Sequence, residues 1–222
     1  MQGGGRLRDL RVAPGYVAAV AATAGVLHGT LTPAARDAVV RACSTNVHNL
    51  SQGRWSVLGT SMLVPDHRPS AAELTVLLAV LGTGELVLGP DGLLLVMTAG
   101  HCGASLLVYA GLRVGIARGW YGSGLLDPCD VGTSYAALAV AAALVRTLPA
   151  PVRGALLVAL GGLVGAPLAG HPSFTDVGHL LAALTGLAAG ALLSPGRGGA
   201  SPPSPWTRSG RPAQRCSGRP RG

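Results

Sequence analysis

Residues 71–112 read AAELTVLLAVLGTGELVLGPDGLLLVMTAGHCGASLLVYAGL, and this stretch decides the fold. It contains two apolar runs that meet at the turn sequence Gly89-Pro90-Asp91. A helix that crosses a bilayer needs about 20 predominantly apolar residues, and each run comes close to that length. The stretch therefore predicts two membrane-spanning helices, residues 71–88 and 92–112, joined by a very short turn.

The same length rule predicts one span before this pair and three after it: residues 16–31, 131–148, 152–169 and 177–193. Composition agrees with a membrane location, because 49% of the 222 residues are hydrophobic and only 12% are charged. A soluble domain would carry about a quarter charged residues. The apolar residues are mostly Ala, Leu, Val and Gly, which let membrane helices pack closely. We expect an all-α, polytopic bundle of six transmembrane helices.

The chain divides into three predicted regions. Residues 1–15 form an N-terminal tail, residues 16–193 form the membrane domain, and residues 194–222 form a basic, Gly/Pro/Ser-rich tail that is expected to be disordered. The first apolar run has no A-x-A site before a soluble domain, so we interpret it as a span and not as a cleaved signal peptide. The long first loop contains two amphipathic pieces, residues 33–43 and 51–64, that predict short helices in the membrane interface.

All 17 basic residues are Arg, and the formal net charge is +8. Six of these Arg residues lie in the C-terminal tail with no nucleic-acid-binding motif around them. We therefore expect the tail to contact anionic lipid and to set topology, with no nucleic-acid partner. With six spans, the side that carries both termini holds eleven Arg and the other side holds six. This excess predicts cytoplasmic termini, in a multi-pass protein that we expect in a bacterial plasma membrane.

The four cysteines show none of the pairing that binds metals, and no metal or organic cofactor is expected. Cys43 and Cys129 both fall on the predicted outer side, where a disulfide could tie the first loop to the connection before the fourth span.

Two spans open in the same way. The fourth begins Asp130-Val-Gly-Thr-Ser134 and the sixth begins Asp176-Val-Gly-His179, and both enter the membrane from the outer side. Ser134 and His179 should therefore lie at similar depth, as a Ser–His catalytic dyad requires. Asp130 and Asp176 are placed to cap the two helices. A membrane Ser can instead bond its own helix, and a lone His can simply bridge two helices.

Several motifs occur in the order found in the rhomboid intramembrane serine proteases, and the six-span plan resembles that family. Residues 54–64, RWSVLGTSMLV, resemble the first-loop stretch that leads into the second span. Residues 82–89, GTGELVLG, resemble the Glu-x-x-x-Gly turn after it. Gly132-Thr133-Ser134 resembles the start of the nucleophile motif, and Gly178-His179 resembles the motif of the base. The resemblance implies that Ser134 is the nucleophile and His179 the general base, with Gly132 and Thr133 supporting the oxyanion.

The sequence departs from the family pattern at two places. Tyr135 stands where the resemblance leads us to expect Gly after the nucleophile. Pro69 and Glu73 stand where a His and an Asn would help to hold the oxyanion. His101 in the third span is a candidate substitute donor, although its small neighbours favour a role in helix packing.

Three functions remain open from the sequence. The leading hypothesis is an intramembrane serine protease that cleaves transmembrane segments of other membrane proteins. The alternative is a catalytically inactive rhomboid-like protein that binds such segments. A small transporter or channel is the third, but the predicted spans contain no paired charges.

Overall fold

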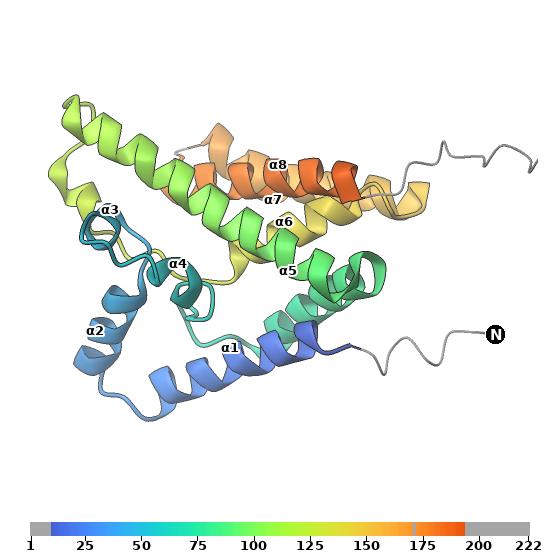
Figure 1. Cartoon of the computed structure of the whole chain (residues 1–222), viewed down its shortest axis with the longest axis horizontal. Coiled ribbons are helices and arrows are strands. Elements are labelled where there is room, and N and C mark those ends of the chain that lie inside the picture. The colour runs from blue at the N-terminus through green and yellow to red at the C-terminus, as the bar shows by residue number, and fades with distance from the viewer. Residues whose placement is uncertain (1–9, 171, 194–222) are drawn as a thin grey trace, which may run out of the picture.

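The computed structural model describes residues 10–170 and 172–193, and within these ranges all regular structure is helical (Figure 1). The longer helices are α1 (Val12–Gly29), α5 (Ala71–Ala117), α6 (Ser134–Leu144), α7 (Ala150–Ala169) and α8 (Phe174–Leu193). Between α1 and α5 lie α2 (Pro33–Cys43), α3 (Val47–Ser51) and α4 (Val57–Thr60), and a 3₁₀ turn, η2 (Ser123–Leu126), precedes α6. The predicted C-terminal tail, residues 194–222, lies outside the described residues, as does most of the N-terminal tail.

Four helices in the described part of the chain are long and apolar enough to cross a membrane: α1, α5, α7 and α8. These helices make the chain a multi-pass membrane protein. Helix α6 is apolar but has only 11 residues, fewer than a perpendicular span requires. The predicted count of six spans is therefore not confirmed by helix length and composition.

Helix α5 covers both of the runs from which the fold was predicted. Its 47 residues would extend for roughly 70 Å if straight, about twice the thickness of the hydrocarbon core. The helix is instead kinked at Gly89, whose φ of 76° and ψ of 169° are not helical, and Pro90 follows. Glycine adopts a positive φ without a steric penalty, and the Pro90 ring cannot donate a backbone hydrogen bond. The chain turns back at this point (Figure 1).

Helix α6 forms the centre of the bundle between α5 and α8. Nearly all of its side chains are buried, and glycines on both neighbours lie against Ala139. A Cβ atom added at Gly186 of α8 would lie 2.0 Å from the Ala139 carbonyl oxygen, and one added at Gly100 of α5 would lie 2.1 Å from the Ala139 Cβ. Small residues at such crossings allow helix backbones to approach closely. This packing fixes α8 beside α6.

Glu85 joins α1 to α5. Its side chain is 5% exposed, and its carboxylate accepts backbone N–H bonds from Arg11, Val12 and Ala13 at 2.8, 3.0 and 2.8 Å. The first N–H groups of a helix have no partner within the helix, and the helix dipole favours a negative charge there. The buried carboxylate is thereby satisfied, and the start of α1 is held against α5. Helix α1 accordingly begins at Val12, earlier than the predicted Tyr16.

The first loop partly matches its prediction. Helix α2 has the predicted bounds, with Thr32 as its N-cap, whereas the second amphipathic piece is only partly helical, in α4. The proposed disulfide is absent from the structure, because Cys43 and Cys129 are both free thiols.

Candidate active site

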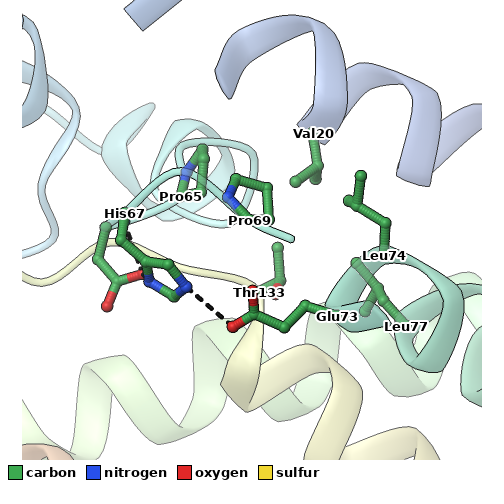
Figure 2. Close-up of a pocket in the computed structure, with 9 residues that line it drawn as sticks. Val20, Pro65, His67, Pro69, Glu73, Leu74, Leu77 and Thr133 are labelled. Carbon is green, nitrogen blue, oxygen red and sulfur yellow. Dashed lines mark hydrogen bonds and ion pairs between the residues drawn. The ribbon is translucent and has the colours of Figure 1, made fainter. Parts of the chain in front are cut away.

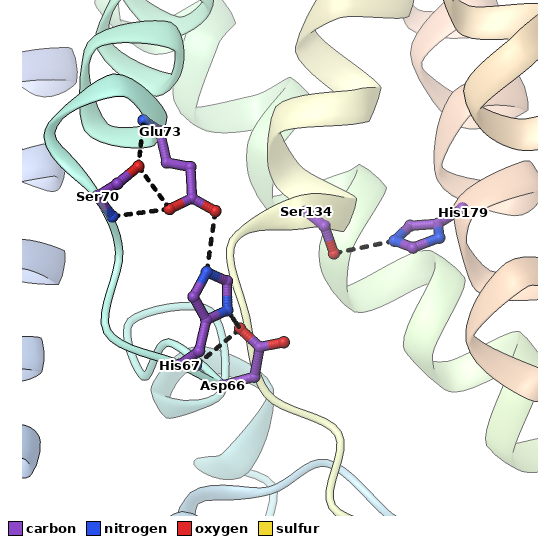
Figure 3. A network of polar contacts seen from close by, with 6 residues as sticks. All are labelled: Asp66, His67, Ser70, Glu73, Ser134 and His179. Carbon is purple, nitrogen blue, oxygen red and sulfur yellow. Dashed lines mark hydrogen bonds and ion pairs between the residues drawn. The ribbon is translucent and has the colours of Figure 1, made fainter.

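Ser134 and His179 face each other across the α6–α8 contact. Ser134 is the first residue of α6, and His179 lies in the second turn of α8. The distance from Ser134 Oγ to His179 Nε2 is 3.0 Å, a hydrogen-bonding distance (Figure 3). Ser134 is exposed and His179 is half-buried. The hydroxyl is therefore open to a ligand while the imidazole is held by the bundle.

Tyr135, the departure from the expected glycine, is accommodated by Gly178 on the facing helix. A Cβ at Gly178 would lie 2.0 Å from the Tyr135 hydroxyl oxygen and 2.3 Å from its Cζ. The absent side chain therefore leaves space for the phenol ring. That ring meets the His179 imidazole edge to face, with centroids 5.2 Å apart and an interplanar angle of 90°. Such a contact stabilises one ring orientation, so Tyr135 helps to fix His179.

His101 is not placed as an oxyanion donor. Its side chain is 3% exposed, and its Nε2 bonds the Ser61 hydroxyl at 2.9 Å. The ring also packs at a tilt against Tyr135, with centroids 5.9 Å apart. His101 therefore joins α5 to Ser61, the C-cap residue of α4 in the first loop, which fits the packing role that its small neighbours favour.

The helix-cap prediction was wrong for Asp130. Helix α6 begins only at Ser134, and its N-cap, Thr133, makes no side-chain cap bond. Asp130 lies too far upstream, and its carboxylate accepts a 2.6 Å bond from the Tyr109 hydroxyl. Burial raises the pKa of Asp130 to about 6, although the Tyr109 bond acts in the opposite direction.

Asp176 does cap α8, but from within the first turn. Its carboxylate accepts bonds from the Ser173 backbone N–H and hydroxyl at 2.8 and 2.7 Å, and its own N–H bonds the Ser173 hydroxyl oxygen at 3.3 Å. This reciprocal pattern is a capping box. The predicted bonds to the following turn are replaced by bonds to Ser173, three residues before Asp176.

The first loop holds the segment that leads into Ser134. The Asp130 N–H donates to Ser44 Oγ at 2.6 Å, and the Thr45 N–H donates to the Asp130 carbonyl at 3.0 Å. Asn46 bonds the Asp127 carboxylate at 3.0 Å. Sequence reasoning missed these residues. The polar run Ser44-Thr45-Asn46 in an apolar chain was the available signal, because buried polar groups need partners.

Gly132 and Thr133 complete this segment. Gly132 has a φ of 136°, and a Cβ there would meet nothing within 4 Å. Glycine is required at this position because of the positive φ, and not because another helix packs closely against it. The Gly132 N–H donates to the Ser61 carbonyl at 2.9 Å, so this amide is already engaged and cannot also bind an oxyanion. The first N–H groups of α6, from Ser134 onward, have no partner within the helix.

Thr133 borders a small cavity of about 80 Å³ between α1, the 65–70 segment and the start of α5 (Figure 2). Pro69 and Glu73 also line it. Pro69 and Glu73 stand where the family resemblance leads us to expect oxyanion donors. Both therefore lie beside the segment that leads into Ser134.

A polar cluster stands on the side of Ser134 away from His179 (Figure 3). The His67 ring lies between two carboxylates, with Nδ1 2.7 Å from Asp66 Oδ1 and Nε2 2.9 Å from Glu73 Oε1. The Glu73 carboxylate also accepts bonds from the Ser70 backbone N–H and hydroxyl, in the capping box at the start of α5. The hydrogen bonds from Glu73 and then Asp66 raise the pKa of His67. This cluster fastens the 65–70 segment to α5.

The described residues contain no group of three or more His, Cys, Asp or Glu side chains that could hold a metal ion. The arrangement instead offers a hydroxyl, an imidazole and a helix N-terminus. Comparison with known proteins found no match among curated proteins and none among solved structures. A family model described as rhomboid-like protein matches residues 8–199, which include every described helix. The chain belongs to the rhomboid-like family.

Proposed function

We propose that the protein is an intramembrane serine protease that cleaves transmembrane segments of other membrane proteins. The observation that carries this proposal is the 3.0 Å separation of Ser134 Oγ and His179 Nε2. A nucleophile and a base within hydrogen-bond reach are the signature of an activated serine. As the base, His179 carries its proton on Nδ1 and accepts the Ser134 proton on Nε2.

The reaction then follows from these two groups. The Ser134 oxygen attacks the carbonyl carbon of a peptide bond, and the proton moves to His179. The bond to nitrogen breaks, His179 returns the proton to the leaving amine, and an acyl-serine remains. Water, deprotonated by His179, releases the second product and restores Ser134. The free amides in the first turn of α6 are the nearest donors for the oxyanion.

The same proposal includes the path of the chain through the membrane. Because α5 breaks at Gly89 into two apolar limbs, we propose six crossings, with the short α6 buried at the centre. The excess of Arg on the side of the termini supports cytoplasmic termini in a plasma membrane. Substrate segments would reach Ser134 from within the bilayer.

A second function is favoured by a specific observation. The Gly132 amide is engaged by Ser61, and Pro69 and Glu73 occupy the positions of the missing donors. Loss of one oxyanion donor typically costs about 10²–10³ in rate. The alternative is therefore a rhomboid-like protein without catalysis that binds transmembrane segments.

A fluorophosphonate probe distinguishes the two functions. We expect the full-length protein in detergent to be labelled on Ser134, and Ser134→Ala or His179→Ala to abolish labelling. Ser123→Ala, which removes another exposed serine, is the matched control and should label like the wild type. A folded wild-type protein that takes no label would overturn the protease and leave the binding function.

A further inference from the structure

An apolar groove of about 650 Å³ lies where α5 ends and α8 begins. Leu107, Gly111 and Leu112 of α5 form one wall, and Phe174, Val177 and Leu181 of α8 form the other. Trp120 and Tyr121, in the connection after α5, also line the groove. The volume falls within the range of roughly 300–1,000 Å³ that is usual for ligand pockets.

The rim of this groove carries a positive charge. The Arg118 guanidinium carbon lies 5.3 Å from the centroid of the Trp120 ring, which places the cation beside the groove lining. Arg118 is exposed, and it forms no ion pair within residues 10–170 and 172–193.

The groove thus combines three features at the end of a membrane helix: apolar walls, two exposed aromatic rings and a guanidinium that has no carboxylate partner among the described residues. Trp and Tyr are enriched at the level of lipid headgroups. A guanidinium matches the geometry of a phosphate with two parallel N–H donors. The apolar walls match an acyl chain.

We propose that this groove binds an anionic phospholipid of the bilayer, with one acyl chain between α5 and α8 and the headgroup phosphate on Arg118. The site is independent of the chemistry at Ser134. It uses the face of α8 that carries Phe174, Val177 and Leu181, whereas Gly178 and Gly186 on another face pack against α6. Charge complementarity separates this site from apolar surface that carries no Arg, which bulk lipid covers without preference.

The proposal is tested with two photoreactive lipids, a phosphatidylglycerol and a phosphatidylcholine that carry the same diazirine acyl chain. The full-length protein is reconstituted in phosphatidylcholine vesicles that contain a trace of either probe, and the labelled peptides are mapped by mass spectrometry. We expect the 107–125 and 172–181 segments to react roughly fivefold more with the phosphatidylglycerol probe, because one Arg near the surface contributes about that factor.

Two variants with matched controls locate the interaction. Arg118→Gln should remove the headgroup preference, whereas Arg146→Gln should not; Arg146 is another exposed Arg, and it makes no ion pair with the residues that the structure describes. Gly111→Leu should lower labelling by both probes, because its new side chain enters open space at the groove. Gly103→Leu adds the same side chain to α5 away from the groove lining, where it also meets nothing within 4 Å, and should leave labelling unchanged.

Equal labelling of the wild type by both probes would mean that bulk lipid fills the groove, and the proposal would fall. A preference that survives Arg118→Gln would overturn it as well. If Gly111→Leu changes the oligomeric state in detergent but not the lipid labelling, the groove takes a second copy of the chain and not a lipid.

Discussion

The Gly186→Ala substitution tests the crossing of α6 and α8 on which the site depends. The new Cβ would lie 2.0 Å from the Ala139 carbonyl oxygen, 2.7 Å from its carbonyl carbon and 2.8 Å from its Cα. The first distance is about 1.4 Å short of the 3.4 Å at which ordinary van der Waals contact begins. All three atoms belong to backbone, so no side chain can rotate away. The two helices must separate, and we expect the free energy of unfolding to fall by about 3 kcal/mol, the upper end of the usual cost of overpacking.

The same displacement should affect the Ser134–His179 pair. Gly186 lies two turns beyond His179 on α8, and the 3.0 Å hydrogen bond has only about 0.5 Å to spare before the 3.5 Å limit of such a bond. A misplacement of about 1 Å can cost on the order of 10²-fold in rate. We therefore expect the rate of fluorophosphonate labelling to fall by about that factor, at a temperature where the variant is still folded.

The assay combines the labelling rate with the unfolding midpoint in detergent. Gly161→Ala on α7 is the matched control, because a Cβ at Gly161 would meet nothing within 4 Å. Alanine is favoured over glycine in a helix by roughly 0.5–1 kcal/mol, so this control should be slightly more stable than the wild type and should label normally. If Gly186→Ala is as stable and as reactive as Gly161→Ala, the close crossing of α6 and α8 is refuted.

Three further predictions follow from single side chains. Glu85→Ala should lower the unfolding free energy by about 3 kcal/mol or more in a detergent titration, since it leaves three backbone N–H groups without their carboxylate; an effect under 1 kcal/mol would contradict this role. Because burial raises the pKa of Asp130 from 3.8 to about 6, this group should make stability fall as pH rises between those values, and Asp130→Asn should flatten that part of the profile. His67 has a raised pKa, so its contribution to the free energy of unfolding should be complete below about pH 6.5 and lost as pH rises through the raised value. Glu73→Gln should reduce this pH dependence of stability, and an unchanged profile would count against the cluster.

The sequence alone determined the features that depend on neighbouring residues. The length of an apolar run, the turn at Gly89-Pro90 and the amphipathic pattern of residues 33–43 each depend on a short stretch of chain, and the structure contains the corresponding helices. The two Asp-Val-Gly openings predicted Ser134 and His179 near the starts of their helices for the same reason, although Ser134 is the first residue of α6 and His179 lies in the second turn of α8. The error on Asp130 also has a local cause, because the helix starts later than the apolar pattern does.

Only the tertiary structure decided which distant groups meet. Ser134 and His179 are 45 residues apart, and Ser44 and Asp130 are 86 apart. Whether such pairs touch depends on how α5, α6 and α8 are rotated about their axes, and glycine contacts such as Gly186 on Ala139 set that rotation. The fit of the Tyr135 ring into the space at Gly178, and the engagement of the Gly132 amide by Ser61, likewise result from packing between elements far apart in the chain. Backbone approach and side-chain volume are properties of two surfaces together, so no single stretch of sequence specifies them.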